Sequence, residues 1–390
     1  MELRLKSTTH VVPEYSLTGD LLSFQRCARQ YRYYNGSSLP PARPVQMWYG
    51  EFIHGMLEEA FLLWRNSKPA FPWPYTEVST DTRPGPPEPG LEPHDIRSIG
   101  WPIETSLAQQ GKRARSRDAR ASAYRRAATA INTLGPTLFH LIETNEQKII
   151  GTRELPSQEA PTVERRADQY GLKGIIDVLS QVTLSSTHSD NAIRAAVAEI
   201  VDDTDGAYEV IVDYKGSRRP PVSDDPRSEW QLGQWQVLTY AWLRQRQPEA
   251  RPVAACVLVY VNELSPGGGD YTRLLADINQ SRTDVFPEPN SDDDNRLRAY
   301  TPGTEPGLSA EFLLKRALRV IPVTDAAIEE ATTAFDGIVS RIEHRVATEA
   351  ADGSIRTVWE ANCTEEATCV ACDFKEGCEH AVARGWNATD

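Results

Sequence analysis

An apolar segment, a helical segment and a second apolar segment in succession constrain this fold most strongly. Residues 208–214 (YEVIVDY) are mostly apolar but end in charge, whereas residues 253–261 (VAACVLVYV) are almost entirely apolar. Such uninterrupted apolar runs are typical of strands that are covered on both faces. Residues 229–247, between them, repeat apolar side chains at helical spacing. The pattern predicts an α/β core.

Further strands and helices are expected on both sides of this unit. The spacing of apolar residues and the local composition predict strands over residues 149–155 and 173–182. They predict helices over residues 16–34, 46–65, 105–145 (with a break at Gly135-Pro136) and 325–349. Residues 68–104 are rich in Pro, and residues 262–307 are rich in Gly, Pro and Asp, so both stretches are expected to be irregular. The mixed order predicts a mixed central sheet flanked by helices.

Charge and hydropathy exclude two classes of protein. The 390-residue chain has a formal net charge of −13, which argues against a protein that coats nucleic acid through overall basicity, although local basic patches remain compatible. No apolar run is long enough to span a membrane, and the first residues lack the apolar stretch of a secretory signal. We therefore expect a cytoplasmic protein without a membrane partner.

Acidic residues and a lysine mark two of the predicted strands. Asp213 and Lys215 end one strand, two residues apart, so their side chains emerge on the same face. Asp177 lies on the preceding strand. Carboxylates from neighbouring strands can hold hard divalent cations such as Mg²⁺ or Mn²⁺. An adjacent lysine suits metal-assisted phosphodiester hydrolysis, although a simple salt pair at the end of a strand is the alternative.

Three residues elsewhere are candidates for the same site. His54 shares a helix face with apolar residues and can serve as a metal ligand through its neutral imidazole, although a buried structural histidine is the alternative. Gln236 and Tyr240 lie four residues apart on the predicted helix 229–247, so they share one face and could contact Lys215 or a phosphate. Glu154 is considered as one more acid of the site.

Four of the six cysteines lie in the last 28 residues. Cys369, Cys372 and Cys378 provide three thiolates within ten residues. A four-coordinate zinc ion or a four-iron cluster needs a fourth ligand, which either Cys363, nearby, or Cys27, in the first helix, could supply. The second choice would join the two ends of the chain.

Together these motifs resemble the RecB-like branch of the PD-(D/E)XK nuclease superfamily. They resemble in particular its iron–sulfur members, such as the CRISPR-associated four-cysteine nucleases and the AddAB nuclease domain. The matching motifs are SLTGDLLSFQRCARQY at residues 16–31, GEFIHGMLE at 50–58, GIID at 174–177, VDYK at 212–215, Gln236-x3-Tyr240 and Cys369-x2-Cys372-x5-Cys378.

The resemblance implies a restriction-endonuclease-like α/β core and a set of site residues. It implies that Mg²⁺ or Mn²⁺ is bound by His54, Asp177, Asp213 and the carbonyl of Tyr214, with Lys215 as the catalytic lysine. It also implies that Cys27, Cys369, Cys372 and Cys378 bind a [4Fe–4S] cluster that joins the N- and C-terminal regions. The threonine that usually follows the catalytic lysine is Gly216 in this chain.

Five segments follow from this interpretation. They are N-terminal helices with Cys27 and His54 (1–67), a Pro-rich insertion with a basic helical region (68–147), the nuclease core (148–262), an irregular excursion (263–322) and a C-terminal helix with the cysteine tail (323–390).

The predicted function is metal-dependent hydrolysis of DNA, preferably of single-stranded ends or flaps, in repair, recombination or defence. The predicted DNA contacts are Arg218 and Arg219, directly after the catalytic strand, and Arg113 and Arg117, in a basic run. The alternative is a catalytically idle, cluster-stapled DNA-binding or scaffold subunit of a helicase–nuclease complex. The sequence has no Walker A motif, so unwinding would require a helicase partner.

Overall fold

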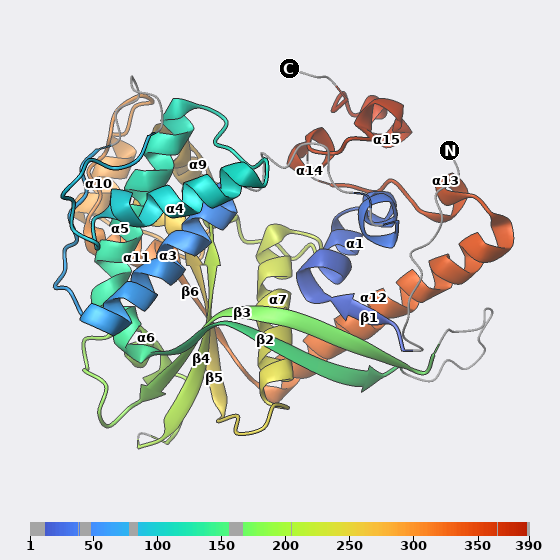
Figure 1. Ribbon diagram of the computed structural model, residues 1–390, viewed down its shortest axis with the longest axis horizontal. Coiled ribbons are helices and arrows are strands. Elements are labelled where there is room, and N and C mark those ends of the chain that lie inside the picture. Colours follow the sequence, from blue (N-terminus) through green and yellow to red (C-terminus); the bar gives the residue numbers. More distant parts are fainter. Residues whose placement is uncertain are drawn as a thin grey trace.

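A six-stranded mixed sheet with helices on both faces forms the core of the computed structural model (Figure 1). The structure describes residues 12–37, 39, 48–77, 85–155, 167–203, 205–364 and 366–387. The strands run in the order β1-β3-β4-β5-β6, and β2 pairs with the opposite edge of β3. Their bounds are β1 Glu14–Ser16, β2 Ile142–Glu154, β3 Gln169–Thr183, β4 Ala207–Lys215, β5 Val253–Tyr260 and β6 Leu318–Pro322. This architecture confirms the predicted α/β fold.

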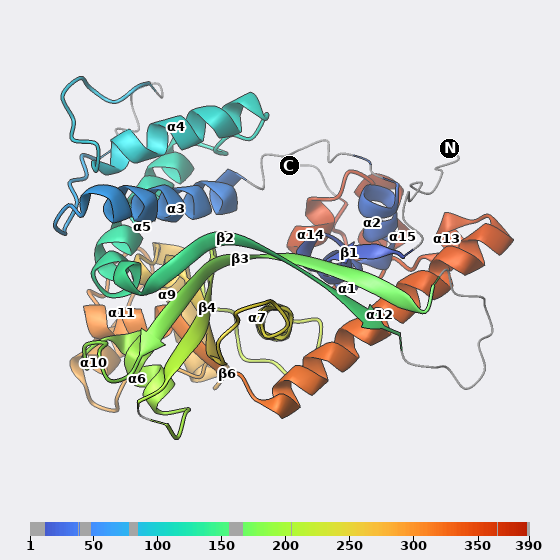
Figure 2. The ribbon, with the colours of Figure 1, turned by 60° about the horizontal axis from the view of Figure 1, so that its bottom comes forward.

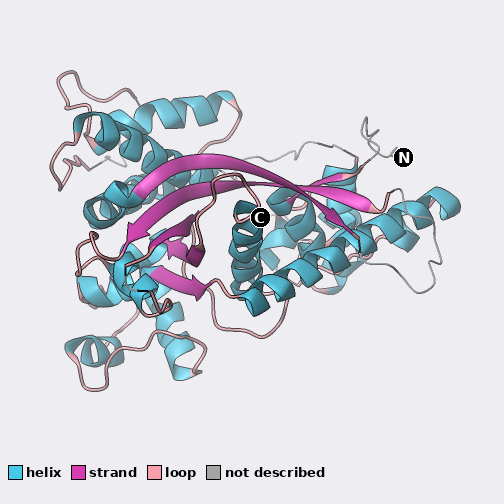
Figure 3. Cartoon of the chain, turned by 90° about the horizontal axis from the view of Figure 1, so that it is seen from below, coloured by secondary structure: helices cyan, strands magenta, loops and turns pink. Residues whose placement is uncertain are grey.

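Two groups of helices cover the sheet. Helices α3 (Trp48–Ser67) and α5 (Arg117–Leu138) pack on one face, and α7 (Glu229–Arg244) and α12 (Asp325–Asp352) pack on the other (Figures 2 and 3). The shorter helical segments are η1 Leu17–Leu22, α1 Ser23–Arg26, α2 Ala28–Tyr31, η2 Arg32–Gly36, α4 Ile96–Gln109, η4 Phe139–Leu141, α6 Ala192–Ala198, α8 Val261–Leu264, α9 Gly268–Asn279, α10 Asp292–Arg298, α11 Ala310–Ala317, α13 Ile355–Val358, α14 Glu366–Val370, η5 Lys375–Gly377 and α15 Glu379–Ala383. None of the helices among the described residues is long and apolar enough to cross a membrane.

The centre of the sheet is the predicted strand–helix–strand unit. β4 and β5 are parallel neighbours, and α7 makes the crossover between them. All eight residues of β5 are buried, because β4 and β6 flank it and helices cover both faces. The continuous apolar sequence of β5 therefore reflects its central position.

One edge of β3 has two strand partners with a gap between them. β1 pairs with β3 up to Lys173, and β4 pairs with β3 from Val178 onward. Among the described residues, the intervening positions 174–177 have no strand partner on this edge. Helix α7 packs against the backbone here: a Cβ on Gly174 would lie 2.5 Å from the Tyr240 ring, so this close approach requires glycine.

Several predicted elements differ from the observed ones. The helix predicted over residues 16–34 is interrupted at Cys27, whose φ of −161° is extended. The break predicted at Gly135-Pro136 is absent, because α5 continues through both residues and Gly135 packs against Phe71. The Pro-rich stretch 68–104 contains the start of α4, although its residues 78–84 lie outside the described part.

The predicted irregular excursion is also more regular than expected. Residues 262–307 contain most of α8 and the whole of α9 and α10, and β6 was not predicted. Sparse apolar residues from separate helices, including Leu274, Leu297 and Phe312, form a small core of their own. Because these residues come from separate short helices, their common core depends on tertiary contacts that the local Gly-, Pro- and Asp-rich composition does not show.

Candidate active site

The candidate site lies where β3 and β4 separate. Their pairing ends at Val178 and Val212, and beyond it the backbone N–H of Tyr214 donates to Oδ2 of Asp177 over 2.9 Å. A side chain thus replaces the next hydrogen bond of the ladder. Asp177 and Asp213 are the next residues beyond the last pair, so both acids lie at the point where the two strands diverge, which we call the fork.

His54 approaches the fork from α3. Its neighbours Phe52, Ile53 and Leu57 are buried, whereas the His54 side chain lies at the edge of the apolar face and is 33% exposed. His54 Nδ1 lies 3.4 Å from Asp177 Oδ2. The predicted inward orientation of His54 therefore brings the imidazole to the first acidic motif.

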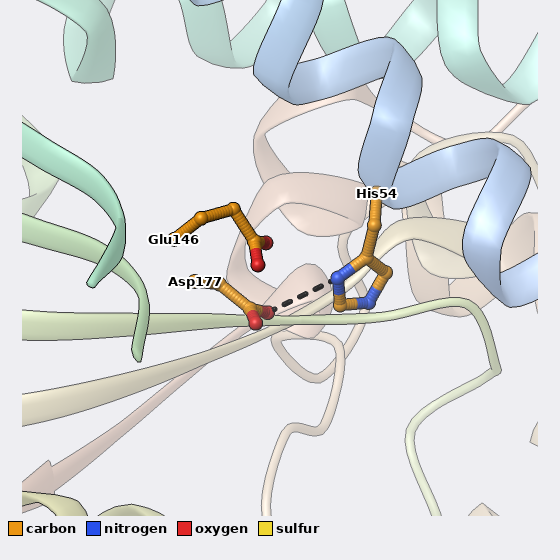
Figure 4. A group of neighbouring side chains, drawn as sticks. All are labelled: His54, Glu146 and Asp177. Atoms are coloured by element: carbon orange, nitrogen blue, oxygen red, sulfur yellow. Dashed lines mark ion pairs between the residues drawn. The ribbon is translucent and has the colours of Figure 1, made fainter. Parts of the chain in front are cut away.

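Glu146 on β2 is the third member of this group. One ligand atom from each of His54, Glu146 and Asp177 lies within 4.8 Å of the others, and both carboxylates point toward the imidazole (Figure 4). Glu146 has a positive φ of 48°, which is rare in a strand and locally redirects the chain. The pairs Asn145–Val178 and Gln147–Ile176 place Glu146 opposite Asp177.

Glu146 was not predicted from the sequence, and Glu154 was considered in its place. Glu154 pairs with Gln169 at the far end of β2, and its carboxylate accepts a hydrogen bond from the Gln169 side chain there, so it does not belong to the site. The predicted strand began at residue 149, whereas β2 begins at Ile142. Only the strand register reveals the position of Glu146, because the sequence gives it no distinctive motif.

Lys215 lies in a closed network with residues of α7. Its Nζ lies 2.7 Å from Asp213 Oδ2 and donates to Gln236 Oε1 over 2.7 Å. Gln236 Nε2 in turn donates to Asp213 Oδ1 over 3.0 Å and lies 3.2 Å from the Tyr240 hydroxyl. The structure thus brings together all four residues that were predicted from the second acidic motif and the helix after it.

Burial and like charge raise the pKa of two acids of the site, Asp177 and Glu146. Burial raises the pKa of Asp177 well above its usual value, and the charges of Asp213 and Glu146 raise it further. The hydrogen bond from the Tyr214 N–H and the charge of Lys215 lower this pKa, but they do not offset the rise. Partial desolvation and the charges of Glu58 and Asp213 raise the pKa of Glu146.

For Lys215, burial and the neighbouring charges shift the pKa in opposite directions. Burial alone lowers the pKa of Lys215, but the attraction of Asp213 and Asp177 outweighs it, so the pKa is raised. Lys215 therefore carries a proton at neutral pH, and the site has a fixed positive charge beside its acids.

The donor set fits a hard divalent cation. Two carboxylates and one imidazole converge, and the carboxylates repel each other unless a cation or proton lies between them. Asp213 belongs to the same site, but Lys215 and Gln236 engage its two oxygens. The Tyr214 ring packs edge-on to His54 with centroids 6.1 Å apart, and metal binding by the Tyr214 carbonyl stays a prediction.

The site opens into a cavity of about 1,200 Å³. Its walls come from η1, α3, β2, β3, the end of β4 and α7. A second cavity of about 680 Å³ shares Lys215, Ser217 and Gln236 with the first and is also lined by Arg218. The network around Lys215 therefore lies between two adjoining cavities.

The predicted DNA-binding arginines differ in accessibility. Arg219 is only 3% exposed, and its guanidinium binds Asp284 and the carbonyls of Arg316 and Leu318. It holds the excursion onto the core, so the predicted DNA contact of Arg219 is wrong. Arg218 pairs with Asp277 on the wall of the second cavity.

The other two arginines, Arg113 and Arg117, are exposed beside a separate cavity. Much of the basic run around them is neutralised, since Lys112 pairs with Glu51 and Arg120 pairs with Glu104. Contacts of Arg113, Arg117 and Arg218 with DNA stay predictions.

The segment 263–322, which Arg219 holds onto the core, also depends on a buried ion pair. Glu263 accepts from Nε of Arg316 over 2.8 Å and from the Arg219 N–H over 2.8 Å. Because Glu263→Ala leaves the buried Arg316 guanidinium without its counter-charge, we expect the free energy of unfolding to fall by roughly 3–5 kcal/mol. Denaturant titration tests this. The matched control, Glu311→Ala, removes an exposed pair with Lys315, so a similar loss there would contradict the prediction.

Five of the six cysteines line one small cavity of about 40 Å³. They are Cys27, Cys363, Cys369, Cys372 and Cys378. Burial raises the pKa of Cys27, Cys369 and Cys372. The sixth, Cys256, lies in β5. Several thiols that face a common space are suited to a soft metal or an iron–sulfur cluster, which binds them as thiolates and displaces their protons.

The cysteine cavity joins distant parts of the chain. The segment η1–η2 lies beside α12–α15 (Figure 1). Arg32 forms a buried pair with Glu349 at 2.6 Å, and Arg29 binds the Trp359 carbonyl over 2.9 Å and Glu379 over 2.6 Å. The predicted proximity of Cys27 to the C-terminal cysteines is thus present, while Cys363 also lies among them.

Comparison with known families supplies an independent finding. The profile of the PD-(D/E)XK nuclease superfamily matches residues 19–379, which is most of the chain. Proteins of this superfamily are, in general, metal-dependent nucleases. A comparison with curated proteins found no match.

Proposed function

Because the chain belongs to the PD-(D/E)XK nuclease superfamily, we propose that it is a Mg²⁺- or Mn²⁺-dependent deoxyribonuclease. It hydrolyses phosphodiester bonds of single-stranded DNA, as an exonuclease or flap endonuclease in repair, recombination or defence. The observation that carries this proposal is the convergence of His54, Glu146 and Asp177 beside a protonated Lys215.

The proposed division of labour follows from the contacts. His54, Glu146 and Asp177 hold the cation, and Asp213 stands next to them. When bound, the cation supplies charge neutralisation at the phosphate and a more acidic water. Lys215 donates hydrogen bonds to a phosphate oxygen or to the attacking water. Gln236 and Asp213 fix the position of Nζ, because both contact it at 2.7 Å.

The cysteine site has a separate, structural role in this proposal. Cys27, Cys369, Cys372 and Cys378 bind a [4Fe–4S] cluster, with Cys363 as the alternative to Cys27. The common cavity of these thiols and the ion pairs around it support the assignment. The cluster holds η1–η2, whose Thr18 lines the cavity over the acids.

The second candidate is an idle DNA-binding or scaffold subunit of a helicase complex. It would bind DNA without cleaving it. The closed network of Lys215, Asp213 and Gln236 favours the nuclease, because a subunit without catalysis has no need to bury a lysine–carboxylate pair at the mouth of a cavity.

Metal binding and cleavage together test the proposed function. We expect end-labelled single-stranded DNA to be cleaved with Mg²⁺ or Mn²⁺ and to remain intact with chelator. We expect Asp177→Asn to abolish cleavage and to weaken Mn²⁺ binding at least tenfold in calorimetry, since it removes a charged ligand. The affinity of the unaltered chain for Mn²⁺ should increase with pH, because the cation displaces protons from acids whose pKa is raised.

The matched control is Glu154→Gln, at the other end of β2. It should leave both cleavage and Mn²⁺ binding unchanged. Cleavage that persists in Asp177→Asn or with chelator would refute the metal-dependent assignment. Single-strand binding without cleavage in Mn²⁺ would favour the idle subunit.

A further inference from the structure

A strip of side chains leads away from the acids along the exposed face of β2 and β3. Side chains alternate along each strand, so every second residue shares this face. Directly paired rows are Lys148 with Ile175 and Ile150 with Lys173. The row before them holds Glu146 and Asp177, and each row is about 7 Å from the next. The strip is thus continuous with the candidate metal site.

Two isoleucines of the strip are exposed although their neighbours are buried. Ile150 is 63% exposed and Ile175 is 42% exposed, whereas Ile149 and Ile176, on the other face, are buried. Both exposed side chains line the cavity over the acids. Apolar side chains that remain exposed inside a functional cavity mark a binding surface.

The lysines of the strip give this surface the charge of a polyanion site. The sequence contains only eight lysines, and three of them, Lys148, Lys173 and Lys215, line this one cavity. The same cavity is also lined by five acidic residues, namely Glu51, Glu58, Glu146, Asp177 and Asp213. The positive charge that attracts phosphates is therefore confined to the strip itself, at Lys148 and Lys173. Lys173 lies 3.6 Å from Glu14, but both side chains are about half exposed, so water and salt weaken that pair.

We propose that Lys148, Ile150, Lys173 and Ile175 bind single-stranded DNA on its way to the acids. The lysines contact phosphates, and the isoleucines contact the faces of bases. Those faces are stacked inside a duplex and become accessible in a single strand, so alternating apolar and cationic side chains favour the single strand. The inference rests on the proposed nuclease function and adds the surface that binds the single strand.

Figure 2 shows the route that this strip provides. The middle of β2 and β3 arches between α3 and the η1–α2 region. Both of these flanking elements contribute to the cavity, η1 through Thr18 and α3 through Gly50 and His54. A strand that lies along the arch passes over the two Lys–Ile rows before it reaches Glu146 and Asp177.

Separate substitutions of the two residue types test the proposal with chelator present, so that binding is measured without cleavage. We expect Ile150→Ser/Ile175→Ser to weaken binding of a fluorescent single-stranded oligonucleotide about tenfold, with duplex affinity and salt dependence unchanged. The matched control is Phe286→Ser, which removes an apolar side chain that is 48% exposed and does not line the cavity. It should bind like the unaltered chain.

The lysine variant has a different signature. Lys148→Gln/Lys173→Gln removes two phosphate contacts, so the slope of log affinity against log salt should become shallower by about 1.4 for the single strand. An unchanged slope would refute the proposal that this strip binds single-stranded DNA. An isoleucine variant that binds the single strand as tightly as the unaltered chain would refute it as well. If both variants behave as expected but the unaltered protein cleaves nothing in Mg²⁺ or Mn²⁺, the strip stands and the nuclease proposal fails.

Discussion

Lys215→Ala is expected to reduce cleavage of single-stranded DNA by about 10³-fold, on the scale of losing one preorganised charged donor at a reacting phosphate. The structure gives the reason. Nζ is held by Asp213 and Gln236, and its pKa is raised, so the ammonium group is both charged and positioned before substrate binds. Initial rates on an end-labelled oligonucleotide measure the effect.

A second measurement separates loss of catalysis from loss of the metal site. Because the substitution removes a positive charge beside the acids and releases Asp213 Oδ2, we expect Mn²⁺ affinity to be equal or higher in Lys215→Ala. The control, Lys315→Ala, removes an exposed lysine on α11 and should cleave normally. A Lys215→Ala protein that retains its fold and cleaves within tenfold of the unaltered chain would contradict the catalytic role.

Cys27→Ala is expected to remove the iron from the protein and to lower its stability severely. A cluster held by Cys27 and three C-terminal cysteines closes a loop of more than three hundred residues, and cross-links of long loops contribute roughly 3–5 kcal/mol. We expect about four iron atoms per chain after anaerobic purification and nearly none in the variant. Iron analysis and thermal unfolding measure the two effects.

Two further cysteine variants make the result specific. Cys256→Ala alters a thiol in the middle of β5 and should keep its iron, because Cys256 does not line the cysteine cavity. Cys363→Ala should also keep its iron if Cys27 is the ligand. Loss of iron in Cys363→Ala together with retention in Cys27→Ala would assign the fourth ligand to Cys363. Zinc in place of iron in the unaltered protein would refute the cluster.

For side chains on regular helices and strands, the sequence was sufficient to predict which of them share a face. Asp213 and Lys215 end an apolar strand, and Gln236 and Tyr240 share a helix face, so periodicity alone predicts where these side chains point. Their proximity to Asp177 was expected because the two predicted strands are neighbours, and the resemblance to the nuclease family implied it. The structure contains each of these contacts, while their catalytic roles stay predictions.

Other positions depend on tertiary contacts that no local pattern contains. Glu146 reaches the site through a left-handed backbone conformation within a strand and through the register of β2 on β3. Arg219 has the sequence context of a DNA contact, but Asp284 and Glu263 come from a segment that was expected to be irregular. Once that segment folds onto the core, Arg219 is buried within it.

The pairing of the first helices with the last ones has a consequence for biosynthesis. Arg29 and Arg32 find their partners at Trp359, Glu379 and Glu349, more than three hundred positions later. During translation, the N-terminal segment must therefore wait without these partners until the residues up to Glu379 have left the ribosome. Assembly of the proposed cluster at the shared cysteine cavity is then expected to be a late step. A chain that stops before Glu349 lacks both the cavity and the support of its own first helices.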